Sequence, residues 1–346
     1  MGTADPDYVS EILNDVRSQI AVDDDVLSET KDRRNLVKRI ARRFDGSLKT
    51  FDSGSVAHGT VNKPVSDADC GLVLDRRSFP ELGPDGDNDP PNEVVHEVKD
   101  LIVEVVREDY PDATAQVTKR AILVEFAEPI DDEQDPSVDL IVALTRAEED
   151  GRWIPNIEDE RWDASDPEKH TDLLIGPDKD TRVHRARVIR LAKAAVKQDD
   201  LPVVSSFNLE ALALDLLDGD GTIAESLRTL LLEGADDLAD GDTPDPAGVS
   251  DPIKLPDGIS RDEAVSRLRG FGEAVDKAIC NQADDAVVRA ELAKLFPDFV
   301  ELEPSDKRRL ADALKTGDSP KIGRAFGAGA AALPSTRAYG GSRAEK

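Results

Sequence analysis

The sequence is short of cysteine and of aromatic residues. Its 346 residues include only two cysteines, Cys70 and Cys280, which lie far apart in the chain, so neither a disulfide framework nor a cysteine metal cluster is predicted. We interpret both cysteines as small buried hydrophobic residues. Aromatic residues make up 4% of the chain against 39% for all hydrophobic residues. The core is therefore expected to consist mainly of Leu, Val, Ile and Ala.

Long apolar runs are also missing. No run approaches the ~20 apolar residues that a membrane-spanning helix needs. Residues 1–10 lack the basic and apolar segments of a secretory signal peptide. We therefore expect a cytoplasmic protein without a membrane partner.

Basic residues are also scarce relative to acidic ones. The chain has 44 basic and 73 acidic residues, a formal net charge of −29. Such a field repels nucleic acid and anionic membranes, so binding to either by bulk electrostatics is not expected. An anionic ligand such as a nucleoside triphosphate would need a local basic surface and a divalent cation. The alternative reading of the acidic excess is solubility in a salt-rich cytoplasm.

The order of apolar patterns divides the chain into two lobes and a tail. Apolar residues at helical spacing predict helices at 8–22 and 28–44. Short β-type runs follow at 48–52, 69–75, 113–118, 120–126 and 137–144, with a further helix at 93–108. Further helices are predicted at 181–198, 206–218, 221–235, 260–280, 284–295 and 305–316. A long exposed loop is expected at 236–258. The fold class is therefore α+β: a lobe with a small mixed sheet (1–180), an all-helical lobe (181–318) and a mobile basic Gly/Ala-rich tail (319–346).

Residues 52–75, DSGSVAHGTVNKPVSDADCGLVLD, carry the most informative motif. Gly54 and Ser55 follow a predicted strand and open a turn, where a glycine backbone and a serine hydroxyl can bind phosphate oxygens. Asp67 and Asp69 then open the next strand. Side chains at i and i+2 of a strand share a face, so both carboxylates can bind one Mg²⁺.

Asp139 is the expected third carboxylate. It lies within the apolar strand SVDLIVAL, where a charge is costly without a cation or hydrogen-bond partners. Three such acids can hold two Mg²⁺ ions, with Mn²⁺ as a substitute, around a transferring phosphoryl group. An Asp-x-Asp alone means little in so acidic a chain, since Asp85 and Asp87 form another in a loop. The order of strand, Gly-Ser turn, Asp-x-Asp strand and later Asp strand is what distinguishes this set from solvated surface acids.

This motif resembles the GS…DxD signature of the DNA polymerase β-like nucleotidyltransferases. Residues 154–170, 182–198 followed by 205–213, and 250–261 resemble the CD-NTases, the cyclic-oligonucleotide synthases of bacterial anti-phage signalling. The resemblance spans about residues 8–327. It implies that the enzyme joins nucleoside triphosphates, ATP or others, into a cyclic di- or trinucleotide with release of pyrophosphate.

The resemblance also implies a donor-triphosphate lysine and a serine in the helical lobe. Lys193 matches the lysine, and Ser205 or Ser206 matches the serine. From the residues alone, helix 181–198 has one basic face that includes Arg187 and Lys193, which a solvated helix could equally have. Ser206 could instead cap the helix that follows it.

Other polar and aromatic residues are weaker candidates. His58, in the Gly-Ser turn, could contact phosphate, although a structural role is the more common one. Trp153 and Trp162 could stack on a base, with packing as the alternative. Asn156 could hydrogen-bond to a base edge.

Two other functions stay open at this stage. One is a polymerase β-type transferase that adds nucleotides to an RNA end or a protein hydroxyl, and the other is a catalytically silent nucleotide-binding module. The tail carries five basic residues and one acid, opposite to the body, and we expect it to bind a regulatory or conjugating protein.

Overall fold

The computed structural model describes residues 8–130, 134–197, 202–282, 284–302, 304, 307 and 308. The chain forms two compact units, a helical unit and a sheet unit. Of the described residues, 8–21, 179–243 and 253–308 belong to the helical unit, and 22–178 and 244–252 belong to the sheet unit. The predicted tail at 319–346 and most of the predicted helix at 305–316 lie outside the described residues.

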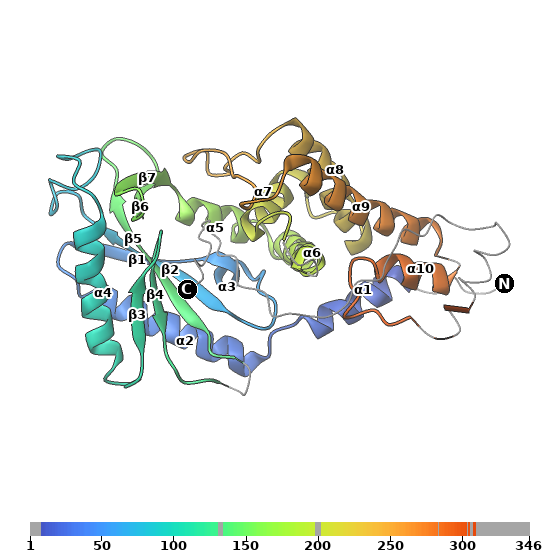
Figure 1. The fold of residues 1–346 in the computed structure, drawn as a ribbon, viewed down its shortest axis with the longest axis horizontal. Coiled ribbons are helices and arrows are strands. Elements are labelled where there is room, and N and C mark those ends of the chain that lie inside the picture. The colour runs from blue at the N-terminus through green and yellow to red at the C-terminus, as the bar shows by residue number, and fades with distance from the viewer. Residues whose placement is uncertain are drawn as a thin grey trace. The chain divides into compact units, whose positions relative to one another are not determined.

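The sheet unit is built on a mixed sheet, as expected for an α+β fold (Figure 1). Its main path runs in the order β1-β2-β5-β4-β3. The strands are β1 (Ser47–Ser53), β2 (Asp67–Leu74), β3 (Thr114–Val117), β4 (Ile122–Glu125) and β5 (Ser137–Thr145). Only β2 and β5 are parallel, and the other neighbouring pairs on this path are antiparallel.

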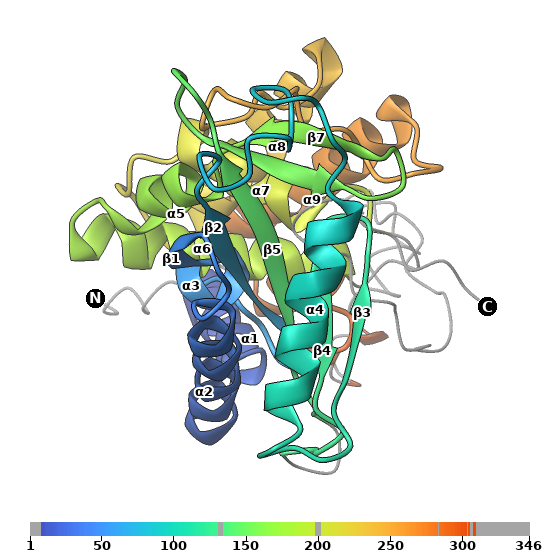
Figure 2. The same cartoon turned by 90° about the vertical axis from the view of Figure 1, so that its left-hand side faces the viewer.

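Two helices, α2 (Asp24–Ala41) and α4 (Asn92–Val106), cover one face of this sheet (Figure 2). Their apolar residues form the main core together with alternate residues of the two central strands. From those strands the core takes Cys70, Leu72 and Leu74 of β2 and Val138, Leu140, Val142 and Leu144 of β5. The period of two in a strand therefore sends Asp67, Asp69 and Asp139 to the opposite face.

The last part of the first predicted lobe, after β5, contains structure that the sequence analysis did not predict. Strands β6 (Arg152–Asn156) and β7 (Arg161–Ser165) form a hairpin that pairs with the end of β5. Pro155 interrupts the β-type pattern of β6, because proline lacks the N–H that a strand ladder uses. Helix α5 (Pro167–Ile175) follows, with Asp166 as its N-cap and Pro167 in its first turn.

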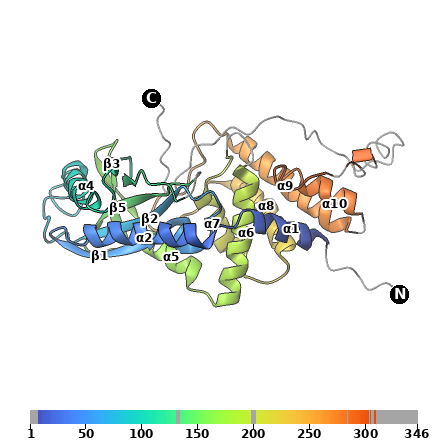
Figure 3. The ribbon, with the colours of Figure 1, turned by 90° about the horizontal axis from the view of Figure 1, so that it is seen from below.

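The helical unit contains α1 (Tyr8–Gln19), α6 (Lys179–Lys197), α7 (Ser206–Leu216), α8 (Ile223–Asp240), α9 (Arg261–Cys280) and α10 (Asp285–Leu292). Figure 3 shows α8 and α9 side by side along much of their length. The buried residues of α1, which include Val9, Leu13 and Val16, pack within this unit. Helix α1 thus groups with the helical unit, although the lobe boundary expected from the sequence places it with the strands.

The predicted loop at 236–258 is partly ordered structure. Helix α8 extends to Asp240 because Leu238 is buried, and Thr243 pairs with Ile253 in an antiparallel bridge. Residues 244–252 belong to the sheet unit, where Lys169 Nζ donates to the Ala247 carbonyl at 2.8 Å. The Asp245 carboxylate accepts from three backbone N–H groups of the same segment, those of Ala247, Val249 and Ser250.

Candidate metal and nucleotide site

Strands β2 and β5 bring two predicted carboxylates together. In the parallel pairing, Asp69 lies opposite Asp139, and Asp67 lies opposite Ser137. Asp69 is 6% exposed and Asp139 3%, whereas Asp67 is half-buried at the start of its strand. Ser66 Oγ donates to Asp67 Oδ1 at 3.0 Å. The register thus places all three side chains on one face of the sheet, at the end where both strands begin.

Gly54 lies directly beneath the carboxylate of Asp69. Strand β1 pairs with β2 so that Ser53 is opposite Asp69, and the chain turns at Gly54 with φ +70°. A Cβ at position 54 would lie 1.8 Å from Asp69 Oδ2 and 2.5 Å from its Cγ. Position 54 therefore requires glycine for two reasons: its backbone is left-handed, and the Asp69 carboxylate occupies the space that a side chain would need.

The short helix α3 (Gly54–His58) begins at this turn. Ser55 is in its first turn, and the Ser55 carbonyl accepts the N–H of Thr60 at 2.9 Å. The side chain of Ser53 is fully buried, and its Oγ has no hydrogen-bond partner among the described residues. A buried hydroxyl without a partner is unusual. Ser53 is therefore a site residue that the sequence analysis missed, and its position just before Gly54-Ser55 is the signal that could have found it.

His58 connects α3 to α5. It is buried, and its Nε2 lies 3.0 Å from Thr171 Oγ1. The ring also meets the His170 ring edge-on, with 5.3 Å between the ring centroids. Thr171 Oγ1 in turn donates to the Pro167 carbonyl at 2.9 Å. His58 is thus held between α3 and α5 by its contacts to Thr171 and His170.

A buried arginine fixes the segment that leads into β5. Arg33 of α2 donates to Asp135 Oδ1 at 2.6 Å, to the Pro136 carbonyl at 3.1 Å and to the Glu128 carbonyl. Its guanidinium also lies over the ring of Phe126, 4.8 Å from the centroid. Asp139 follows this segment by only a few residues.

The segments before β2 and β5 are also joined to each other. The Val65 N–H donates to Gln134 Oε1 at 3.1 Å, and the Ser137 N–H donates to the Ser66 carbonyl at 3.0 Å. These bonds hold the starts of the two strands at the same level, which is where the carboxylates lie.

The remaining predicted residues belong to the helical unit. Lys193 of α6 is 4% exposed, and its Nζ lies 2.6 Å from Oε1 of Glu210, which is 3% exposed. Arg187 on the same helix is exposed, so the basic face predicted for this helix is partly buried. Ser205 caps α7 by accepting the Asn208 N–H at 3.1 Å, and Ser206 is the first residue of that helix.

The tryptophans and Asn156 have packing partners. Trp162 lies in the main core and donates to the Asp89 carbonyl at 3.0 Å. Trp153 donates to Asp85 Oδ2 at 2.8 Å. Asn156 is buried and donates to the carboxylates of Asp159 and Asp163. The two indole N–H groups and the Asn156 amide are therefore engaged within the sheet unit.

The donor set fits a hard divalent cation. Asp67, Asp69 and Asp139 offer carboxylate oxygens only, the ligands that Mg²⁺ and Mn²⁺ prefer. Two nearly buried carboxylates on adjacent strands also repel each other, and a bound cation would offset that repulsion. The three carboxylates and the glycine turn beside Asp69 together form the candidate metal site.

Comparison with known proteins identifies the family. Residues 8–176 match the model of the Second Messenger Oligonucleotide or Dinucleotide Synthetase (SMODS) domain. No sequence among curated proteins matches the chain. Residues 8–176 thus form a SMODS domain, which indicates a nucleotidyltransferase that synthesises cyclic oligonucleotides.

Solved structures of low sequence identity share the fold. CdnG of Bradyrhizobium diazoefficiens in complex with GTP matches with a TM-score of 0.63 and 14% identity, over 86% of this chain and 97% of that chain. CdnC of E. coli MS115-1 in complex with HORMA-deltaN matches with a TM-score of 0.61 and 15% identity, over 84% and 98%. Vibrio cholerae DncV, a cyclic AMP-GMP synthase, in complex with the linear intermediate 5' pppA(3',5')pG matches with a TM-score of 0.55 and 14% identity, over 85% and 87%. The expected polymerase β-like fold is confirmed.

None of the helices in the described part of the chain combines the length and the apolar character needed to cross a membrane.

Proposed function

We propose that this chain is a Mg²⁺-dependent synthase that joins nucleoside triphosphates into a cyclic di- or trinucleotide for anti-phage signalling. The observation that carries the proposal is the pairing of Asp69 with Asp139 above Gly54. Asp67, at the start of β2 on the same face of the sheet, completes the set of carboxylates. Mg²⁺ held by these three residues, as two ions, would neutralise phosphate charge and polarise the α-phosphate.

Different residues bind the phosphates of the donor and accept the proton of the acceptor. Gly54 and Ser55 bind the β- and γ-phosphates of the donor, since a glycine turn exposes backbone N–H groups and Ser55 adds a hydroxyl. Lys193, with Ser205 or Ser206, adds contacts to the donor triphosphate from the helical unit.

The reaction is an in-line substitution at phosphorus. A 2′- or 3′-hydroxyl of the acceptor attacks the α-phosphorus, a new P–O bond forms, and the bond from that phosphorus to the bridging oxygen breaks. Pyrophosphate leaves with the electron pair of that bond, and Asp139 accepts the hydroxyl proton. Most of the acceleration comes from positioning and charge neutralisation. A second transfer closes the ring.

One experiment separates this proposal from its alternatives. The purified chain is incubated with Mg²⁺ and four labelled nucleoside triphosphates, without RNA or a protein substrate, and the products are resolved by chromatography. A cyclic product that resists phosphatase supports the proposal. A product formed only after RNA or protein is added supports a macromolecule-modifying transferase, and an absence of turnover supports a silent nucleotide-binding module. Asp69→Asn is the inactive control.

We further propose that a protein partner controls the synthase through residues 319–346. The support is the basic composition of this segment and the structure of CdnC in complex with HORMA-deltaN. Pull-down with the full chain and with a chain that ends at residue 327 tests the proposal. A partner retained equally by both chains would contradict it.

A further inference from the structure

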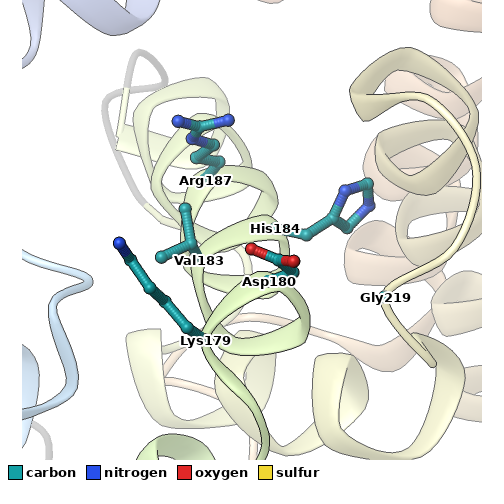
Figure 4. A pocket seen from close by; sticks show the side chains of 6 residues that line it. All are labelled: Lys179, Asp180, Val183, His184, Arg187 and Gly219. Carbon is teal, nitrogen blue, oxygen red and sulfur yellow. The ribbon is translucent and has the colours of Figure 1, made fainter.

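The helical unit has a pocket of its own, formed by α6 and the segment that follows α7 (Figure 4). Its volume is about 410 Å³, which is within the range of small-molecule sites. Lys179, Val183 and Arg187 succeed one another along one side of α6, and Asp180 and His184 lie on the side of Gly219. The spacing i, i+4 and i+8 places the two cationic side chains on one face with an apolar residue between them.

Arg17 of α1 extends this positive surface. Burial, and then the charges of Arg187 and Arg190, lower the pKa of Arg17. The Arg17 Nε–H is buried and has no hydrogen-bond acceptor among the described residues, while Nη1 donates to Asn14. Helices α1 and α6 also pack together, and Arg190 Nη2 donates to the Ile20 carbonyl just after α1 at 3.2 Å, so the guanidinium groups of these two helices lie near one another.

The cations of this surface differ from others of the helical unit in their lack of acidic partners. Arg269 pairs with Asp236 at 2.6 Å, and Arg261 pairs with Asp242 at 2.6 Å. For Lys179, Arg187 and Arg17, the described residues provide no such ion pair. In a chain of net charge −29, a group of mutually repelling cations that form no ion pairs with the described carboxylates is a feature that an anionic ligand would explain.

The opposite side of the pocket is acidic and is less suited to an anion. Burial and the charge of Arg187 lower the pKa of His184, while Asp218 and Asp220 act in the other direction. His184 Nε2 also lies 2.8 Å from Ser226 Oγ, within the unit. An anion would therefore bind on the Lys179–Arg187 side, away from Asp218 and Asp220.

We propose that the helical unit binds a compact polyphosphate group on the surface formed by Lys179, Arg187 and Arg17. Guanidinium groups bind phosphate oxygens in pairs, and two or more phosphates would engage Arg17, Arg187 and Lys179 together. Free pyrophosphate and the phosphate chain of a nucleotide share this chemistry. A long nucleic acid is disfavoured because the rest of the chain would repel its backbone. The inference does not depend on the proposed synthase activity.

The test is calorimetric titration of the full chain with sodium pyrophosphate, in EDTA and at about 50 mM salt. Arg17→Gln and Arg187→Gln should each weaken binding by about tenfold or more, since each removes a charge-assisted pair of hydrogen bonds. Arg269→Gln removes the same charge elsewhere in the unit and should leave the affinity unchanged. Asp69→Asn should also leave it unchanged, because binding in EDTA does not use the metal site.

Melting curves supply a readout that does not depend on titration. Without ligand, Arg187→Gln should melt at or above the temperature of the unmodified chain, because it removes a repulsion. Pyrophosphate should raise the melting temperature of the unmodified chain and of Arg269→Gln, but not that of Arg187→Gln.

ATP titrated in the same buffer distinguishes the two sources of the anion. Affinity for ATP above that for pyrophosphate indicates a nucleotide, and the reverse order indicates free pyrophosphate. Three outcomes would overturn the site: equal affinity in Arg187→Gln, loss of binding in Asp69→Asn, or displacement of pyrophosphate by a single-stranded oligonucleotide that binds more tightly.

Discussion

Asp69 and Asp139 lie side by side on the parallel strands β2 and β5, and each is less than a tenth exposed. Both strands begin at the same level, because Ser137 of β5 donates to the carbonyl of Ser66 just before β2. The arrangement brings two like charges together on the face of the sheet opposite the main core. Such a pair is costly unless a cation or hydrogen-bond donors accompany it.

The first prediction concerns this pair and Asp67. Replacing any one of the three with Asn should lower pyrophosphate release by about 10²-fold or more, because each removes a charged oxygen from the metal site. In EDTA the melting temperature of Asp69→Asn should rise slightly, since one of two crowded charges is gone. The measurements are a pyrophosphate-release assay and thermal melts.

The exposed Asp-x-Asp of the loop at 85–87 provides the control. Asp87→Asn removes the same charge from a solvated position and should change neither turnover nor melting. Retention of more than about a tenth of the activity in Asp67→Asn and Asp69→Asn would show that these residues are not essential metal ligands, since loss of such stabilisation usually costs ~10²-fold.

The second prediction compares two glycines of α3. Gly54 and Gly59 have φ of +70° and +72°, so alanine strains the backbone of both by ~1–2 kcal/mol. A Cβ at Gly59 would meet nothing within 4 Å, whereas a Cβ at Gly54 would collide with Asp69. Gly59→Ala should therefore lose only stability, while Gly54→Ala should also lose activity by about 10²-fold.

Urea unfolding and turnover, measured on both glycine variants, separate the two effects. Similar turnover in Gly54→Ala and Gly59→Ala would mean that the carboxylate of Asp69 can move aside without consequence, and the geometry assigned to the site would be wrong.

How far the sequence predicts the site depends on whether the information is local. Gly54, Ser55, Asp67 and Asp69 lie within one short stretch, so their order and spacing could be interpreted directly. Asp139 could be selected only as a charge within an apolar strand. Its pairing with Asp69 depends on strand order and register, which are set by contacts between distant segments. Ser53 lies directly before Gly54-Ser55, but its burial and its pairing with Asp69 depend on the register of β1 and β2.

Parts of the fold were missed for similar reasons. The β6–β7 hairpin is short and contains Pro155, so no clear alternation marks it. Helix α5 does carry a local signal, Asp166 as N-cap followed by Pro167, which could have predicted it. The grouping of α1 with the helical unit depends on tertiary packing, which the helical periodicity of residues 8–22 does not specify.

The third prediction separates two roles of Lys193. Its ammonium group pairs with Glu210, and both are buried, so Lys193→Met should cost about 3–5 kcal/mol by removing the cation of a buried ion pair. The double variant Lys193→Met with Glu210→Gln should recover most of that stability. If Lys193 also contacts the donor triphosphate, the double variant should still have a raised KM for nucleotide and a lowered kcat.

The matched control on α6 is Arg182→Ala, which removes a positive charge from an exposed position of the same helix. It should change KM less than the double variant does. Normal KM and kcat in the stabilised double variant would restrict Lys193 to a structural role.

The last prediction concerns Arg33, which we expect to position Asp139 through the segment before β5. Arg33→Met removes the hydrogen bonds to Asp135 and to the carbonyls of Glu128 and Pro136. Asp135 and Glu29 keep about a third of their side-chain surface in water, so the loss of stability should be moderate, about 1–3 kcal/mol. The start of β5 should then shift relative to β2, and Mn²⁺ affinity, measured by electron paramagnetic resonance without nucleotide, should fall by about tenfold, the equivalent of 1.4 kcal/mol.

A purely structural role of Arg33 would lower stability without this specific effect on the metal. Val98→Ala provides the comparison, because Val98 lies in the core between α4 and the sheet, and its truncation should cost a similar ~1–3 kcal/mol. Since Val98 packs on the face of the sheet opposite the carboxylates, the Mn²⁺ affinity of Val98→Ala should remain that of the unmodified chain. Equal weakening of Mn²⁺ binding in the two variants would show that general destabilisation accounts for the effect, and Arg33 would then have no particular role in placing Asp139.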